Sequence, residues 1–161
     1  MSVRIVPGAN AFTRIPSGAH SLTAETAAGG VRALRILLDT HAFLWWIADD
    51  PKLSRRARAL IGDSANEVLV SAASTWEIAI KAALGRLRLP ADPGSFVLEQ
   101  IDVNGFTPLA VSVEHTLRVL HLPSTHRDPF DRLLAAQCLA EETALVTRDP
   151  VFKRYGVTVQ W

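Results

Sequence analysis

Four acidic residues stand at places in the chain where a parallel sheet would gather them. Asp39 directly follows one short apolar run, and Glu77 lies one turn into the helical stretch that follows a second run. Asp131 is in the first turn of a long helical stretch, and Asp149 follows a further apolar run. In an open parallel sheet, functional groups collect beyond the carboxyl ends of the strands. We therefore predict that these four carboxylates face one another.

Converging carboxylates need a cation or protons. Two bare carboxylates about 4 Å apart repel by about 4 kcal/mol at an effective dielectric constant of 20, and a helix N-terminus returns only about 0.3–1 kcal/mol. Hard oxygen ligands favour Mg²⁺ or Mn²⁺ over zinc, and the single cysteine excludes a cysteine-based zinc site. The sequence thus predicts a Mg²⁺ (or Mn²⁺) site held by Asp39, Glu77, Asp131 and Asp149.

Each acid also has a purely structural interpretation. Asp128 would cap the long helix, Asp39 or Thr40 the first helix, and Asp149 a last helical turn. Glu77 would only favour the positive end of its own helix. These alternatives stay open at the level of single residues, and only the convergence of all the acids favours a site.

The elements that must position these acids alternate along the chain. Short apolar runs predict strands at 34–38, 67–70, 106–111, 144–147 and 157–160. Helical patterns lie between them at 40–48, 54–61, 74–84, 94–103, 112–120 and 128–141. Pro108 predicts an edge position for the third strand. Helices between strands, without a hairpin signal, predict a three-layer α/β/α domain with a mostly parallel sheet of about four to five strands.

Residues 1–33 differ in character from residues 34–161. The first segment carries three basic residues and one acid, is rich in alanine and glycine, and shows no periodicity. We interpret it as a flexible N-terminal tail, or as an upstream extension of a protein whose true start is near Val31 or Leu34. The predicted domain is 34–161.

The composition excludes several classes of protein. Charged residues are 20% and hydrophobic residues 48%, which rules out a wholly disordered chain. Lys plus Arg is 17 and Asp plus Glu is 16, so the net charge of +1 gives no support to a polycation. The longest uncharged run, 103–113, has 11 residues, whereas a spanning helix needs about 20. Without a signal-peptide pattern, the expected location is cytoplasmic.

Four stretches resemble the PIN-domain proteins of the VapC type, the toxin halves of bacterial toxin–antitoxin pairs. They are LLDTHAFLWW (37–46), EVLVSAASTWEIAIKAALGRLRLP (67–90), HRDPFDRLLAAQCLAEE (126–142) and LVTRD (145–149). The resemblance covers 34–161 and implies a Mg²⁺- or Mn²⁺-dependent endoribonuclease of the PIN fold. It assigns the acidic site to Asp39, Glu77, Asp131 and Asp149. Asp131 is preferred to Asp128 because an apolar Ala-Ala stretch follows it. Asp128 is the alternative ligand or a partner of Asp131, since their i, i+3 spacing places both on one helix face.

The resemblance also implies a mechanism and partners. We expect a metal-activated water to attack phosphorus in line, leaving a 5′-phosphate and a 3′-hydroxyl. The expected partners are RNA, a cognate protein antitoxin and a second copy of the chain, with no membrane. The candidate phosphate contacts are Lys81, Arg132 and Arg148, with Thr147 as a candidate for orienting the water. Lys81 has an alternative, which is a salt bridge to Glu77 at spacing i, i+4.

Other functions remain possible on these residues. An acidic-pocket module could bind a metal, RNA or a protein without cutting, and the proposed chemistry does not exclude a DNA-directed nuclease. An aspartyl-phosphate phosphatase is disfavoured, because Asp39-Thr40-His41 lacks a second Asp two residues after the first. We interpret Trp45, Trp46 and Trp76 as packing residues rather than RNA-stacking residues, and Cys138 as a buried thiol.

Overall fold

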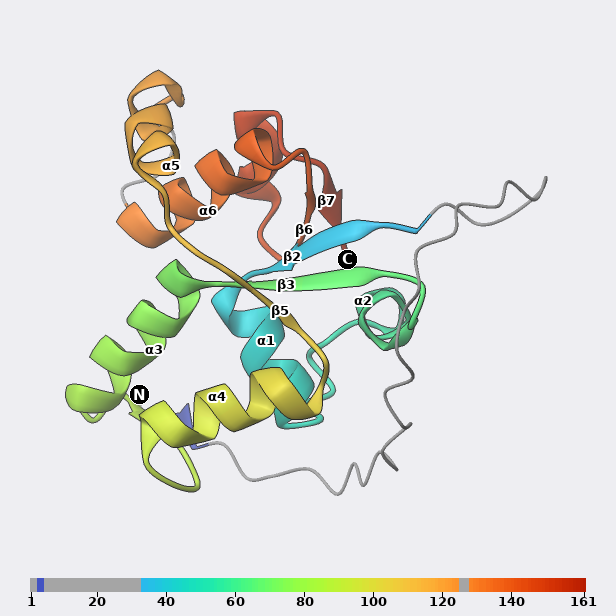
Figure 1. Cartoon of the computed structure of the whole chain (residues 1–161), viewed down its shortest axis with the longest axis vertical. Helices are drawn as coiled ribbons and strands as arrows, with labels where there is room; N and C mark the ends of the chain where they lie inside the picture. The colour runs from blue at the N-terminus through green and yellow to red at the C-terminus, as the bar shows by residue number, and fades with distance from the viewer. Residues whose placement is uncertain (1–2, 5–32, 125–127) are drawn as a thin grey trace, which may run out of the picture.

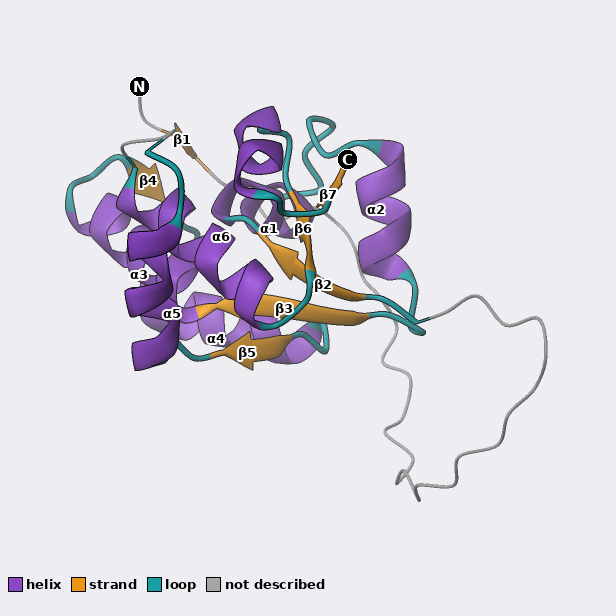
Figure 2. Ribbon diagram, turned by 90° about the horizontal axis from the view of Figure 1, so that it is seen from above, coloured by secondary structure: helices purple, strands orange, loops and turns teal. Residues whose placement is uncertain are grey.

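The computed structural model describes residues 3–4, 33–124 and 128–161. Its centre is a five-stranded sheet in the order β5-β3-β2-β6-β7, and every neighbouring pair is parallel. Figure 2 shows the strands β5, β3 and β2 lying side by side. The five predicted strands are confirmed, and Pro108 does lie in an edge strand. The strands are β2 (Arg35–Leu38), β3 (Glu67–Ser71), β5 (Thr107–Leu109), β6 (Ala144–Val146) and β7 (Val159–Gln160).

Helices cover both faces of this sheet, as the alternating pattern predicted. In Figure 1, α5 and α6 lie on one side of the strands, and α1 and α4 lie on the other. In the described part of the chain, no helix combines the length and the apolar character needed to cross a membrane. The α-helices are α1 (Thr40–Ile47), α2 (Arg55–Gly62), α3 (Ala72–Ala83), α4 (Pro93–Val103), α5 (Val113–Arg118) and α6 (Pro129–Ala140). Two 3₁₀ helices are η1 (Val119–His121) and η2 (Pro150–Tyr155).

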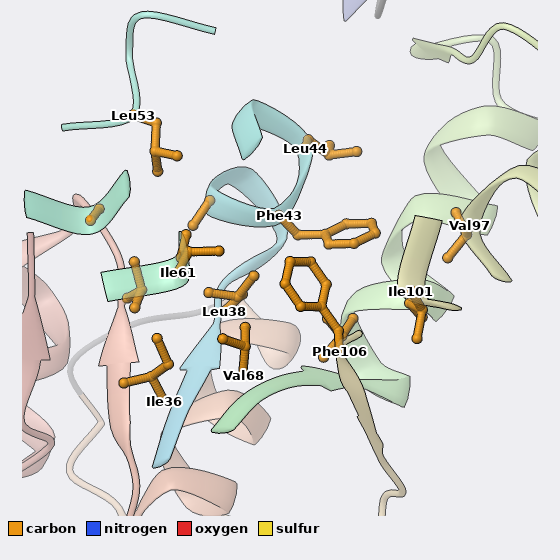
Figure 3. Close-up of a cluster of buried hydrophobic side chains, with 14 of the residues drawn as sticks. Ile36, Leu38, Phe43, Leu44, Leu53, Ile61, Val68, Val97, Ile101 and Phe106 are labelled. Atoms are coloured by element: carbon orange, nitrogen blue, oxygen red, sulfur yellow. The ribbon is translucent and has the colours of Figure 1, made fainter. Parts of the chain in front are cut away.

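The sheet separates two hydrophobic cores. Ile36 and Leu38 contribute to the core under α1, α2 and α4, whereas Leu37 between them contributes to the core under α6. Figure 3 shows part of the first core, where the rings of Phe43 and Phe106 meet edge to face with centroids 6.3 Å apart. Burial on both faces explains why the strand sequences are continuously apolar.

Local hydrogen bonds set the ends of the helices. α3 begins two residues before the predicted start, because the Ser71 hydroxyl accepts a hydrogen bond from the Ala73 N–H at 2.9 Å. Gly85, with a φ of +67°, follows the end of α3 and stops it as expected. The predicted helix 112–120 is α5 up to Arg118 and then tightens into η1.

A second, two-stranded sheet was not anticipated from the sequence. β1 (Val3–Arg4) pairs in parallel with β4 (Leu87–Arg88), which follows α3. Figure 2 shows this pair apart from the five-stranded sheet. Residues 5–32 of the predicted tail lie outside the described residues. The choice between a genuine arm and an upstream extension therefore stays a prediction.

Candidate active site at the carboxyl edge of the sheet

The four sequence-predicted acids line one cavity of about 140 Å³. Asp39 follows β2 directly, Asp149 lies beyond the end of β6, Glu77 lies on α3, and Asp131 lies in the first turn of α6. The structure also brings Asp128 to the same cavity, so the lining of the cavity does not decide whether Asp128 or Asp131 would be the direct metal ligand. The complete lining is Asp39, Thr40, His41, Glu77, Lys81, Asp128, Asp131, Asp149 and Phe152.

Two acids of the site are buried, since Asp39 exposes only 8% of its surface and Glu77 only 9%. The Asp39 carboxylate caps α1 by accepting a hydrogen bond from the Ala42 N–H at 2.5 Å. Burial raises the pKa of Asp39 above its ordinary value of 3.8, and the charge of Glu77 adds to this. Hydrogen bonds from Thr147 and Ala42 lower the pKa of Asp39 but do not cancel the effect of burial. The ionised form is therefore held at a cost that a bound cation would relieve.

Glu77 has both carboxylate oxygens engaged. The Thr40 hydroxyl donates to Oε2 at 2.5 Å, and the Lys81 ammonium lies 2.5 Å from Oε1. This is the i, i+4 salt bridge that the sequence left as an alternative for Lys81. Lys81 also lines the cavity, with 34% of its side chain exposed. The structure thus gives it the salt bridge without removing it from the site.

Thr147 links the two strand-end acids. Its fully buried hydroxyl accepts a hydrogen bond from the Asp149 N–H at 3.1 Å, and its side chain is also hydrogen-bonded to Asp39. Asp149 in turn accepts from the Val151 N–H at 2.8 Å and caps η2. This geometry fixes both carboxylates at the ends of β2 and β6.

Capping and lining the cavity are compatible roles for these acids. Asp128 caps α6 by accepting from the Phe130 N–H at 2.9 Å, as the sequence suggested. Each capping contact of Asp39, Asp128 and Asp149 uses one carboxylate oxygen. The structural interpretation of these acids is therefore right and does not exclude a second role for the same side chains.

The donor chemistry of the cavity fits a hard divalent cation. Five carboxylates line it, against Lys81 and His41 as the basic side chains. Carboxylate oxygens are the ligands that Mg²⁺ prefers. Among the described residues, however, no three acidic, histidine or cysteine side chains already surround one point at metal-binding range. The salt bridge of Lys81 with Glu77 occupies one of the oxygens that a cation would use.

The two candidate arginines lie in different surroundings. Arg132 is not brought to the cavity, because its guanidinium donates to the carbonyls of Val119 and Pro123, each at 2.9 Å. Arg148 is exposed and lines a second cavity of about 310 Å³ beside the acids. This second cavity is lined by Asp39, His41, Trp45, Arg148 and Asp149.

The sequence analysis missed His41 and Trp45 as residues of the site. Their i, i+4 spacing, on the helix that begins just after Asp39, was the available signal. The apolar character of the segment instead favoured packing. Trp45 does pack, because it is half-buried against the first core and its ring lies 5.7 Å from that of Trp161.

Comparison with known proteins identifies the family. The sequence matches the model of the PIN domain over residues 36–157. It is 36% identical to ribonuclease VapC22 of Mycobacterium tuberculosis over 118 residues, which cover 71% of this chain and 86% of the relative. Ribonuclease VapC16 of the same organism is 42% identical over 74 residues, covering 45% of this chain and 52% of the relative.

A solved structure shows the same fold. The crystal structure of VapBC2 from Rickettsia felis, bound to a DNA fragment from its promoter, contains a chain that matches with a TM-score of 0.58. That match has 17% sequence identity and covers 78% of this chain and 97% of the other. Together with the PIN-domain match and the identity to VapC22, it shows that the chain belongs to the PIN-domain family and is a homologue of the VapC ribonucleases.

Proposed function

We propose that this protein is a metal-dependent endoribonuclease and the toxin of a type II toxin–antitoxin pair. The observation that carries the proposal is the cavity at the carboxyl edge of the sheet, where Asp39, Glu77, Asp131 and Asp149 meet. The ribonuclease names of its relatives and the VapBC2 structure support the same assignment. RNA is the substrate in this proposal, and cleavage is hydrolysis of a phosphodiester bond.

In this proposal, Asp39, Asp131, Glu77 and Asp149 hold Mg²⁺ or Mn²⁺, and Asp128 is a further ligand or a partner of Asp131. When bound, such an ion makes water a better nucleophile and neutralises charge on the phosphate. The chain's own part is to hold the carboxylates in place: Thr147 positions Asp39 and Asp149, while Thr40 positions Glu77.

Two basic side chains at the site have roles toward the RNA backbone. Lys81 reaches the cavity and would exchange its contact with Glu77 for a phosphate when a cation binds to that carboxylate. Arg148 lines the neighbouring cavity. Arg132 has a different role, because its contacts to the carbonyls of Val119 and Pro123 tie α6 to η1 and to the residue just beyond it.

The proposed protein partners are an antitoxin and a second copy of the chain. Val113, Leu117 and Leu120 leave a strongly exposed apolar surface along α5 and η1, which such a partner would cover. An antitoxin would also place a basic side chain against the acids. We propose a cytoplasmic location, where a free buried thiol such as Cys138 is ordinary.

The test is the cleavage of single-stranded RNA by the purified protein with Mg²⁺, Mn²⁺ or EDTA. We expect cleavage with either metal and none with EDTA, with products that carry a 5′-phosphate and a 3′-hydroxyl. A 2′,3′-cyclic phosphate would contradict the mechanism. RNA binding without cleavage in both metals would instead indicate a binding module.

The same assay separates the two acids of α6. We expect Asp131→Asn to abolish cleavage and Asp128→Asn to reduce it, since an amide in place of the Asp128 carboxylate retains an oxygen to cap the helix. The reverse order would make Asp128 the direct ligand and Asp131 its partner.

A further inference from the structure

The cavity of about 310 Å³ beside the acids has the composition of a nucleobase site. One wall is aromatic, since the rings of His41 and Trp45 lie 5.5 Å apart and tilted by 36°. Asp39, His41 and Asp149 form its boundary with the acidic cavity, because all three residues line both cavities. A ligand in the second cavity would therefore lie directly beside the proposed catalytic carboxylates.

The aromatic wall is held in place by the fold. Asp39 caps α1, and His41 and Trp45 follow on one face of the same helix. The rings of Trp45 and Trp161 meet edge to face with centroids 5.7 Å apart and planes at 62°, which anchors the Trp45 indole. His41, by contrast, is exposed. A fixed indole beside an accessible imidazole forms a platform on which a flat ring can stack.

The charge at this cavity also suits a nucleotide. Arg148 is exposed and makes no hydrogen bond or ion pair with any residue that the structure describes. Its guanidinium is available for a phosphate or for the face of a base. The cavity is wide open to solvent, and its volume is at the lower end of the roughly 300–1,000 Å³ of ligand pockets, so it would hold one base against its wall rather than enclose it.

We propose that this cavity binds one unpaired nucleobase next to the scissile phosphate, stacked on His41 and Trp45 and flanked by Arg148. The inference rests on the proposed ribonuclease function and makes it more specific. The substrate is single-stranded RNA, whose unstacked bases can be splayed into a pocket. Sequence preference at the cut then depends on this pocket, and the acids supply the chemistry.

The test measures binding without cleavage. The full chain is titrated in EDTA with a short fluorescent single-stranded RNA, and with an abasic oligomer of the same length and phosphate charge. We expect His41→Ala and Trp45→Ala to weaken binding of the RNA by roughly 5- to 100-fold. Binding of the abasic oligomer should not change. Because Trp45→Ala also removes core packing, Trp45→Phe serves as the conservative variant and should retain most of the affinity.

Arg148→Gln probes the charge separately. It should weaken both oligomers and reduce the dependence of log affinity on log salt by about one. Two exposed residues outside the cavity give matched controls: Leu98→Ala on α4 for the loss of apolar bulk in the aromatic variants, and Lys153→Gln for Arg148→Gln. Both controls should bind RNA and abasic oligomer as the wild type does.

Three outcomes would overturn the pocket. The first is that His41→Ala and Trp45→Ala weaken binding of the RNA and of the abasic oligomer equally, and the second is that neither variant weakens RNA binding. The third is that the variants weaken only the binding of an antitoxin, which would assign the cavity to a protein partner. The proposed function fails separately, if the wild type does not cut RNA with Mg²⁺ but still binds it through the base. If the wild type cuts RNA but binds the RNA and the abasic oligomer equally well, only the proposed pocket is overturned.

Discussion

The fold contains two groups of polar side chains. In one group burial disfavours the charge of a carboxylate, and in the other the buried side chains are satisfied by hydrogen bonds. The acidic cavity gathers carboxylates around Asp39, whose pKa burial raises. A second group, here called the core network, consists of Ser71, Gln137, His115 and Glu141. Its Ser71 and Gln137 are fully buried, yet neither side chain carries a charge.

The core network satisfies its own hydrogen bonds. The Ser71 hydroxyl donates to Gln137 Oε1 at 2.5 Å, and Gln137 Nε2 donates to the Ala110 carbonyl at 3.2 Å. His115 Nδ1 accepts from the Ser112 N–H at 3.1 Å, so its Nε2 carries the proton toward Glu141, 3.2 Å away. Buried polar groups that all have hydrogen-bond partners stabilise a fold. Carboxylates gathered in one cavity repel one another, and this arrangement indicates a site that binds a cation.

The largest expected effect comes from Asp39→Asn. The amide keeps an oxygen that caps α1, but it removes the buried charge. Cleavage of RNA should fall by more than about 100-fold, beyond the loss typical for residues that only support a ligand. Asp102→Asn, an exposed change on α4, is the matched control and should cut normally.

The same variant should not be less stable without metal. Because the folded state raises the pKa of Asp39, ionisation at neutral pH costs stability, and that cost shrinks as the pH falls toward the ordinary value of 3.8. In EDTA at neutral pH, Asp39→Asn should therefore unfold at the same or a higher temperature than the wild type. A clear loss of stability would show that Asp39 is mainly structural.

The second effect is stabilisation by the metal itself. At a Mg²⁺ concentration about 100 times its Kd, the free energy of unfolding should rise by about 2.7 kcal/mol, and EDTA should reverse the rise. Thermal unfolding of the wild type and of Asp39→Asn measures this directly. An equal shift of the unfolding temperature in both proteins would mean that the ion binds elsewhere. The acidic cavity would then not differ from the core network in needing a ligand.

These two regions differ in how far sequence could anticipate them. The acids of the cavity could be predicted because Asp39 and Asp149 follow strands, Asp131 opens α6, and Glu77 lies on the helix that directly follows β3. The topology of a parallel sheet brings such positions together. The core network could not be predicted, because a buried glutamine on a helix, such as Gln137, cannot be distinguished by sequence from a glutamine that faces solvent. Its partners Ser71 and Ala110 come from distant segments that only the packed structure brings to α6.

Two further features of the structure lay beyond the sequence pattern for the same physical reason. Arg132 is a candidate phosphate contact because it lies close to Asp131 in sequence, but in the structure its guanidinium donates to the carbonyls of Val119 in η1 and of Pro123. The pairing of β1 with β4 joins two-residue strands, which are too short to leave a periodic signal. Contacts between distant short segments are therefore what the sequence pattern does not reveal.

The third effect probes the core network. Gln137→Leu fills similar space but leaves the Ser71 hydroxyl and the Ala110 carbonyl without their partner, so stability should fall by about 1–3 kcal/mol. Denaturant unfolding measures the loss, and Gln100→Leu on α4, which is only partly buried, should change it by less than about 0.5 kcal/mol. Cleavage per folded molecule should stay at the level of the wild type.

A double variant sharpens this result. Replacing both partners, Ser71→Ala with Gln137→Leu, should destabilise by less than the sum of the two single changes, because no buried partner is left unsatisfied between them. Additive losses would mean that the two side chains act independently, and the core network would not be a unit.

The smallest effect concerns Cys138, which lies on α6 one residue after Gln137. Burial raises the pKa of its thiol to about 12, so the folded protein holds it protonated at neutral pH. A thiol reagent should therefore label the native chain only at the rate of unfolding, and Gln137→Leu should speed that labelling by lowering stability. Fast labelling of the native wild type would show that α6 opens locally. In that case the rigidity attributed to the core network, and with it the fixed placement of Asp131 at the other end of the helix, would be wrong.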